Sequence, residues 1–392
     1  MKKFFIILAI IIGIFIVYYY LDYTKILSRN ISIPKTDLTP SAKNNQLDNA
    51  PAISIFRENL AIPWAIAFLP DGNLLVTERP GKLDLISKNG SSSTLLGNIS
   101  VKAEGEGGLL GVAVSPNFSQ NKNIYLYYTF ASSDSNNMLN RVVKYKLDNN
   151  KLAREKILVD NIPSGSNHDG GRIKFGPDGY LYITTGDGEQ PSLAQSKNTL
   201  GGKILRITED GNPAPGNPFA NAQGKPTNST QNPLIYSYGH RNPQGITWDN
   251  SGQLWETEHG RSIPLSGLDE INKISPGLNY GWPIIQGDEK KEGMVTPVLN
   301  STASVTWAPS GTAFLNGSLF FGGLKGNGLY QYDINTGKLS KYLDGKLGRI
   351  REVVVGPDGF LYITTSNTDG RGTPSEGDDK ILKVNPKKLS EL

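Results

Sequence analysis

The sequence repeats one short hairpin pattern along most of its length. Three copies share the same layout: FLPDGNLLVTERPGKL (68–83), FGPDGYLYITTGDG (175–188) and VGPDGFLYITTSNTDG (355–370). A looser copy, WDNSGQLWETEHG (248–260), and two weaker ones at 114–130 and 314–332 complete the series. In each copy a turn of Pro, Asp, Asn or Gly separates an apolar residue from an alternating strand, which is typical of antiparallel hairpins.

The six hairpins recur at intervals of roughly 40 to 70 residues and therefore predict four-stranded units that bury their faces against one another. Because closing such a ring leaves no exposed end, we predict an all-β, six-bladed β-propeller over residues 51–388. Tandem β-sandwiches are the alternative, but they do not explain one hairpin recurring through the whole chain. The 44 Gly, 24 Pro, 17 Tyr and 13 Phe also favour short strands and tight turns.

The chain starts with two lysines followed by an unbroken apolar and aromatic run from Phe4 to Tyr20. We expect residues 1–23 to be an uncleaved signal anchor, with a cleaved signal peptide as the alternative. Residues 24–50 read as a polar linker. Either interpretation places the propeller outside the cytoplasm, on the periplasmic or extracellular side. If residues 4–20 are retained, they attach the protein to the membrane.

The composition excludes several functions. The chain has no cysteine, so disulfides, thiolate metal sites and a cysteine nucleophile are ruled out. Its net charge of +4 is scattered along the chain, which does not indicate a nucleic-acid-binding protein. The segment EGEGGLLGVAV does not fit a nucleotide-binding glycine motif, and no P-loop, G-x-S-x-G or H-E-x-x-H motif is present.

A histidine and an aspartate flank the second of the three closest hairpin copies. His168 precedes the outgoing strand and Asp187 follows the returning one, so both loop ends fall on the same side of the blade. An Asp bonded to one imidazole nitrogen fixes the tautomer and makes the other nitrogen a better base. The alternative is a loop histidine bonded only to nearby backbone.

Three further loops carry polar residues suited to binding a ligand. Arg241 and Asn242 lie in YGHRNPQG and offer a planar donor fork and an amide; a loop arginine that caps carbonyls is the alternative. Segment 257–283 holds several carboxylates among glycines, hard oxygen ligands that suit Ca²⁺. Arg349 and Arg351, two apart in GRIRE, favour an anion, which Lys325 would also attract, although a solvated edge remains open.

Taken together and in this order, these loops resemble the soluble pyrroloquinoline quinone (PQQ) dependent glucose and aldose sugar dehydrogenase family. The resemblance covers about residues 51–388 and is carried by LAIPWAIAFLPDG, GEGGLLGVA, NHDGGRIKFGPDG, YGHRNPQG, DEINKISPGLNYGWP, APSG and GRIRE. The family fold is a six-bladed propeller, which agrees with the six hairpin repeats. PQQ and Ca²⁺ are the cofactors that the resemblance implies.

The resemblance also implies a role for each matching residue. His168 corresponds to the catalytic base, Asp187 to its orienting carboxylate, and Arg241 and Asn242 to the pair that contacts the quinone. The cofactor's carboxylates would be bound by a cationic set: Lys325, Arg349 and Arg351. Glu106 stands where the glucose dehydrogenases have a glutamine that contacts the cofactor. A planar trianion such as PQQ accounts for several fixed positive partners.

Two calcium positions are implied in the same way. The backbone of Gly260 and Arg261 would hold the Ca²⁺ that binds PQQ, while Glu270 and Tyr280 match ligand positions of a structural Ca²⁺. The sequence departs from the family pattern here, because Gly-Pro is usual at 260–261 and the following loop is longer than is common.

The implied activity is oxidation of the anomeric C1 hydroxyl of an aldose to a lactone, with hydride transfer to PQQ and electrons passing to an unidentified acceptor. The alternatives are a non-catalytic cell-surface propeller that binds a glycan or a protein, and a calcium-dependent lactonase. A lactonase would not need the cations at 325, 349 and 351. Sugar preference and oligomeric state have no readable signal in the sequence.

Overall fold

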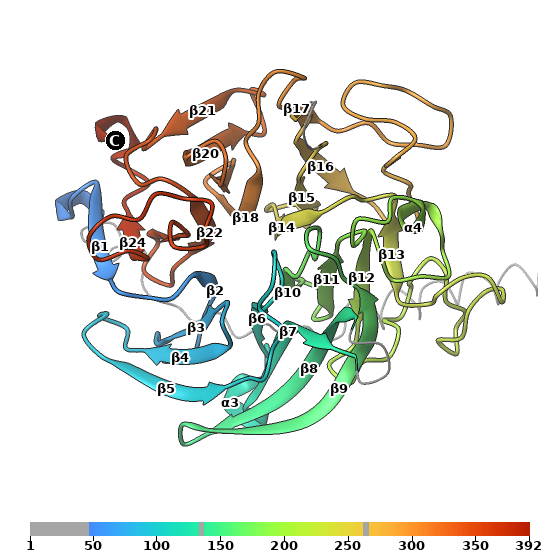
Figure 1. Ribbon diagram of the computed structural model, residues 1–392, viewed down its shortest axis with the longest axis horizontal. Helices are drawn as coiled ribbons and strands as arrows, with labels where there is room; N and C mark the ends of the chain where they lie inside the picture. Colours follow the sequence, from blue (N-terminus) through green and yellow to red (C-terminus); the bar gives the residue numbers. More distant parts are fainter. Residues whose placement is uncertain (1–46, 133–136, 262–265) are drawn as a thin grey trace, which may run out of the picture. The chain divides into compact units, whose positions relative to one another are not determined.

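In the computed structural model, the described residues (47–132, 137–261 and 266–392) form six four-stranded sheets set around a central axis, as Figure 1 shows. This is the all-β, six-bladed propeller that the repeats predict. The compact unit runs from Leu47 to Leu392. The expected signal segment and almost all of the expected linker lie outside the described residues. Among the described residues, no helix is long and apolar enough to cross a membrane.

Each blade is an antiparallel sheet whose first strand faces the axis. In chain order the strands are β1 (Ile53–Arg57); β2 (Pro63–Phe68), β3 (Leu74–Glu78), β4 (Lys82–Ile86) and β5 (Ser93–Asn98); β6 (Leu109–Val114), β7 (Asn123–Ala131), β8 (Met138–Asp148) and β9 (Lys151–Pro163); β10 (Ile173–Phe175), β11 (Leu181–Thr185), β12 (Lys203–Ile207) and β13 (Ile235–Tyr238); β14 (Pro243–Trp248), β15 (Leu254–Glu258), β16 (Glu270–Ile274) and β17 (Leu299–Asn300); β18 (Pro309–Leu315), β19 (Ser318–Gly323), β20 (Gly328–Asp333) and β21 (Leu339–Tyr342); β22 (Ile350–Val355), β23 (Leu361–Thr365) and β24 (Ile381–Val384). In the described part of the chain, the short helices α3 (Phe118–Asn121) and α4 (Ser192–Gln195) lie between strands, and the 3₁₀ helix η1 (Leu389–Glu391) follows β24.

The ring is closed by strand β1, which pairs with β24 as the outermost strand of the last blade. Ile53 lies opposite Val384, so the two ends of the propeller share one sheet (Figure 1). Pairing of this kind ties the N-terminal end of the propeller to its last blade and closes the ring.

All six repeated hairpins are the first two strands of the six blades. In two of the closest copies the turn aspartate accepts a hydrogen bond from a tyrosine on the returning strand: Tyr182 to Asp178 and Tyr362 to Asp358, both at 3.0 Å. The Asp of the Pro-Asp-Gly turn and the Tyr of the strand thus form one local unit, which is why they recur together.

The inner strands β2, β6, β10, β14, β18 and β22 contact one another in sequence around the axis. The strands next to them are buried along their length, as in β3, β11, β15 and β23. Loops that precede the inner strands meet at one end of the central channel. That end holds the predicted site residues.

Candidate active site

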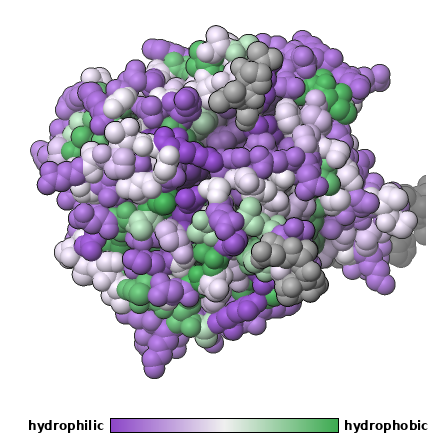
Figure 2. Space-filling model, in the orientation of Figure 1, coloured by the Kyte–Doolittle hydropathy of each residue, from purple (hydrophilic) through white to green (hydrophobic). Residues whose placement is uncertain are grey.

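A cavity of about 670 Å³ lies among the loops that precede the inner strands. Its lining brings together most of the predicted site: Glu106, His168, Arg241, Gly260, Arg261, Lys325 and Arg349. On the molecular face in Figure 2, hydrophilic side chains predominate and apolar ones are scattered among them. The cavity volume falls in the range of small-molecule and cofactor sites.

His168 and Asp187 are in contact, as the hairpin geometry predicts. Nδ1 of His168 lies 2.7 Å from Oδ1 of Asp187. The backbone of His168 is in the left-handed region, with φ of 65°, and is held by hydrogen bonds from its amide to Glu106 and to its carbonyl from the Gly188 amide. A side chain at Gly186 would collide with that carbonyl, so glycine is required there. Strained backbone of this kind is common at functional sites.

Asp187 is fully buried and has both of its carboxylate oxygens engaged. Oδ1 also accepts the amide of Glu189 at 2.9 Å, and Oδ2 accepts the indole N–H of Trp282 at 2.8 Å. The carboxylate is therefore fixed in place. Since it occupies Nδ1 of His168, the Nε2 atom is the ring nitrogen that a ligand in the cavity can reach.

The Arg241–Asn242 turn stands beside this pair. The Asn242 Oδ1 atom accepts the amide of Gly170 at 3.0 Å, and its Nδ2 donates to Glu106 at 3.3 Å. The Arg241 guanidinium lies over the Trp282 ring, 5.3 Å from the ring centroid. Arg241 lines the cavity, whereas Asn242 is fully buried behind the cavity wall, so only Arg241 is in direct contact with the cavity.

The cationic set is brought to one side of the cavity. Arg349 and Arg351 both approach Asp369, at 2.9 and 3.7 Å. Burial, together with the neighbouring Arg349 charge, lowers the pKa of Arg351 to about 9. Its Nε atom is buried and has no hydrogen-bond partner among residues 47–132, 137–261 and 266–392. Two crowded guanidiniums sharing one carboxylate leave a positive charge to be neutralised. Lys325 lines the same cavity with an exposed side chain, whereas Arg351 lies behind the wall.

Sequence reasoning did not identify Arg371 or His259 as site residues. Arg371 donates to Glu106 at 2.9 Å and to Asn167 at 2.8 Å, which links the last blade to the second. Burial alone would raise the pKa of Glu106, but the His259 ring, the Arg371 guanidinium and the His168 amide lower it to about 2. The carboxylate is thus ionised at neutral pH.

His259 is buried beside the cavity, and burial lowers its pKa to about 3. Its Nε2 atom has no hydrogen-bond partner among the described residues. A neutral imidazole with an open nitrogen on the cavity wall is suited to contact a bound ligand. The sequence could have singled out His259 as a candidate site residue, because the chain has only three histidines and this one directly precedes Gly260.

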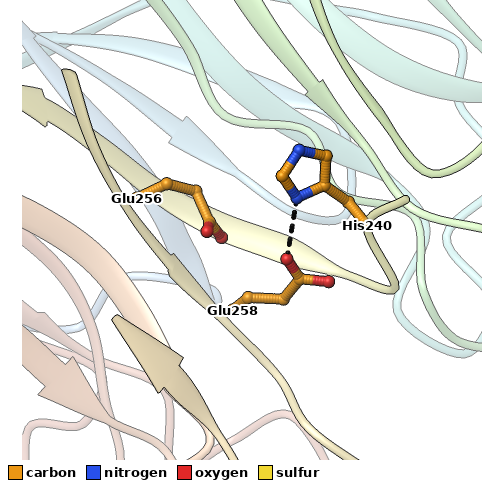
Figure 3. Close-up of side chains that lie close together, drawn as sticks. All are labelled: His240, Glu256 and Glu258. Carbon is orange, nitrogen blue, oxygen red and sulfur yellow. Dashed lines mark hydrogen bonds and ion pairs between the residues drawn. The ribbon is translucent and has the colours of Figure 1, made fainter. Parts of the chain in front are cut away.

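A buried carboxylate cluster lies next to the cavity. Figure 3 shows His240, Glu256 and Glu258, whose potential ligand atoms lie within 4.8 Å of one another. His240 is already satisfied, because Nδ1 meets Glu258 and Nε2 meets Ser237, each at 2.9 Å. Burial, reinforced by Glu258, raises the pKa of Glu256 well above its usual value. With both ring nitrogens of His240 engaged, the trio offers carboxylate oxygens and no free imidazole nitrogen to a metal.

The predicted calcium residues surround a much smaller cavity of about 10 Å³, enough for one small atom or ion. Glu258, Gly260, Arg261, Glu270 and Tyr280 all line it. Burial and the Glu258 charge raise the pKa of Glu270 to about 8, which a bound cation would reverse. The Tyr280 hydroxyl is engaged by backbone, donating to the Lys273 carbonyl at 2.6 Å, so only its carbonyl could be a ligand.

The inner loops of the propeller bring a histidine–carboxylate pair and several cations to one cavity, an arrangement suited to an enzyme that binds an anionic ligand. Sequence comparison then gives the family. The model of the glucose/sorbosone dehydrogenase family matches residues 60–375, and the chain belongs to that family. The resemblance drawn from the loop motifs is confirmed.

Individual relatives support the same family assignment. The aldose sugar dehydrogenase YliI of Escherichia coli is 34% identical over 369 residues, which cover 86% of this chain and 93% of that one. Quinoprotein glucose dehydrogenase B of Acinetobacter calcoaceticus is 33% identical over 289 residues, covering 65% and 57%. The PQQ-bound aldose sugar dehydrogenase of Streptomyces coelicolor superimposes with a TM-score of 0.75 at 38% identity, covering 85% and 98%.

Proposed function

We propose that this protein is a PQQ-dependent aldose sugar dehydrogenase that oxidises the C1 hydroxyl of an aldose to the lactone. The observation that carries the proposal is the His168–Asp187 contact of 2.7 Å on the wall of a cavity rich in cations. The names of the similar proteins, which include a PQQ-bound aldose sugar dehydrogenase, support the same substrate and cofactor.

The donors of the cavity fit PQQ. Its three carboxylates call for several cations in fixed positions, and Arg241, Lys325 and Arg349 line the space with Arg351 directly behind. The partnerless Nε of Arg351 and Nε2 of His259 are buried polar atoms that a cofactor could satisfy. Asn242 does not line the cavity; it is fully buried and positions Glu106 through its Nδ2, so the direct contact with the cofactor that the sequence implies is not one that its position favours.

Oxygen donors next to this space fit Ca²⁺. Gly260 and Arg261, whose carbonyls are the candidate ligands, line both the large and the small cavity. Asp269 anchors the first of these residues, accepting the Gly260 amide at 2.9 Å. Glu270 and the Tyr280 carbonyl would hold a second, structural cation, since burial alone disfavours an ionised Glu270.

In the proposed reaction, His168 removes the proton from the C1 hydroxyl through Nε2. Asp187 keeps the opposite nitrogen protonated and stabilises the imidazolium that forms. Bound PQQ supplies the hydride acceptor, and Ca²⁺ beside it a Lewis acid. Arg241, fixed over Trp282, places a positive charge where negative charge grows on the acceptor.

The experiment is dye-linked aldose oxidation by the apoprotein, with PQQ and Ca²⁺ added separately and together. Activity should require both. His168→Asn should lower kcat by a factor of about 10² to 10⁴ while PQQ binding, read from absorbance, stays unchanged. If PQQ binds but neither the wild-type protein nor His168→Asn oxidises sugar, the proposed substrate class is wrong. Absence of both would favour the non-catalytic binding propeller.

An exported location, with attachment through residues 4–20 if they are retained, completes the proposal. It rests on the apolar N-terminal run alone. Fractionation of cells expressing the full chain, with and without residues 1–23, tests it directly: the full chain should be found with the membrane or outside, and the truncated chain in the cytoplasm.

A further inference from the structure

A second cavity, of about 420 Å³, occupies the central channel away from the active-site loops. All six inner strands contribute to it, through residues such as Ile66, Val112, Phe175, Ala313 and Val354. These residues lie within or near the ends of their strands, whereas His168, Arg241 and Arg349 lie before the strands begin. The channel cavity is therefore separate from the proposed cofactor site.

Three described lining residues are ionisable, and their charges do not balance. Arg172 pairs with Glu352 across the channel and donates through Nε to the Gln244 carbonyl at 3.0 Å. Its remaining Nη2 atom is buried and has no hydrogen-bond partner in the described part of the chain, and the side chain is 6% exposed. The Lys174 ammonium has no hydrogen bond or ion pair with any described residue. Two cations thus face one carboxylate.

The position of the Arg172 guanidinium is fixed. It stacks over the Trp64 ring at 4.1 Å from the ring centroid and is held on two further sides by Gln244 and Glu352. Because these contacts prevent the guanidinium from turning, Nη2 cannot reach another acceptor. A buried donor without an acceptor indicates a ligand that accepts its hydrogen bond. A guanidinium N–H and a nearby ammonium together match a carboxylate.

The rest of the wall is mainly apolar. Its members include Ile66, Phe68, Val112, Phe175, Phe314 and Val354. Inorganic anions gain nothing from such a surface, whereas an apolar body buried against it is stabilised by about 25 cal/mol per Å². The volume is within the range of small-molecule sites.

We propose that this channel cavity binds a small organic carboxylate. Its carboxylate is held by Nη2 of Arg172 and the ammonium of Lys174, and its apolar part packs on the side chains of the inner strands. The site is distinct from the dehydrogenase centre and has its own ligand.

Benzoate is the test ligand, titrated calorimetrically into the full chain loaded with PQQ and Ca²⁺. Saturable binding is expected, with benzyl alcohol, which lacks the charge, at least about tenfold weaker. Lys174→Met should weaken benzoate binding by at least about tenfold, and Lys174→Arg should retain the binding. Lys338→Met, at an exposed turn outside both cavities, should leave benzoate affinity unchanged.

The pH dependence needs no variant. Burial, opposed by Glu352 and reinforced by Arg172, lowers the pKa of Lys174 to about 8. These are the charged groups among the lining residues of the cavity. Benzoate affinity should therefore be highest below this pH and fall above it. The proposal is overturned if benzoate binding is absent up to about 10 mM, is equally strong in Lys174→Met, is weakened as much by Lys338→Met, or is matched by chloride.

Discussion

The indole N–H of Trp282 donates to Oδ2 of Asp187 at 2.8 Å, on the opposite side of the carboxylate from His168. The same ring supports the Arg241 guanidinium, so one side chain positions both the carboxylate and the cation of the proposed reaction. Trp282 acts through Asp187 and Arg241 and is a positioning residue.

Trp282→Phe keeps the ring and removes the N–H. Asp187 then loses one of its fixed donors and can rotate, so kcat should fall about tenfold, a loss of about 1.4 kcal/mol in transition-state stabilisation. The KM for sugar should change little. Steady-state kinetics at saturating PQQ measure both.

Trp255→Phe is the matched control. Its indole N–H also donates to an aspartate, Asp249, at 2.9 Å, but in a turn of the fourth blade away from the cavity. This variant should lose stability and keep kcat. Equal loss of kcat in the two variants would contradict a positioning role for Trp282.

Glu106 puts a negative charge beside the proposed site of a trianion, and Arg371 compensates for it. Glu106→Gln should tighten PQQ binding about tenfold at low salt, while Arg371→Ala should weaken it by a similar factor. In the Glu106→Gln background, Arg371→Ala should have a smaller effect. Fluorescence titration of PQQ at two ionic strengths measures all four proteins; additive effects would show that the pair does not act as a unit.

The fold and the proposed catalytic pair could be predicted because both depend on short-range sequence. The Asp178–Tyr182 bond lies within one hairpin and recurs as Asp358–Tyr362. His168 and Asp187 flank one hairpin, so antiparallel pairing alone brings them together.

Other parts of the site depend on contacts between residues far apart in the sequence. Arg371 meets Glu106 across 265 residues, and Trp282 meets Asp187 across 95. No local periodicity encodes such distances, because they follow from ring closure and from loop conformations without a repeat. The pairing of β1 with the last blade has the same origin, since the strand itself reads like any other short apolar segment.

Lys203 is fully buried and its ammonium donates to three carbonyls, those of Leu193, Ala194 and Gly201. These bonds fix helix α4 next to the active-site cavity. Lys203→Met removes all three bonds and leaves the Gly201 carbonyl without a donor among the described residues, while the Leu193 and Ala194 carbonyls keep backbone donors. It should lower the free energy of unfolding by about 3 kcal/mol in urea denaturation. Lys338→Met, at an exposed turn, is the control and should change it by less than about 0.5 kcal/mol. Similar midpoints for the two variants would contradict this role.

Asp169, adjacent to His168, gives the protein a specific dependence on pH. It is fully buried, and burial raises its pKa from 3.8 to about 6 despite hydrogen bonds from Ser164 and Asn140. Its protonated form is favoured by folding, so the stabilisation is complete below about pH 4 and is lost as pH rises through about 6. Asp169→Asn, which stays neutral, should therefore gain stability relative to wild type by about 3 kcal/mol between pH 4 and pH 7.5. Thermal or urea unfolding at both values measures the difference, with the exposed Asp71→Asn as the control. Parallel pH curves for wild type and Asp169→Asn would show that Asp169 is already ionised without cost.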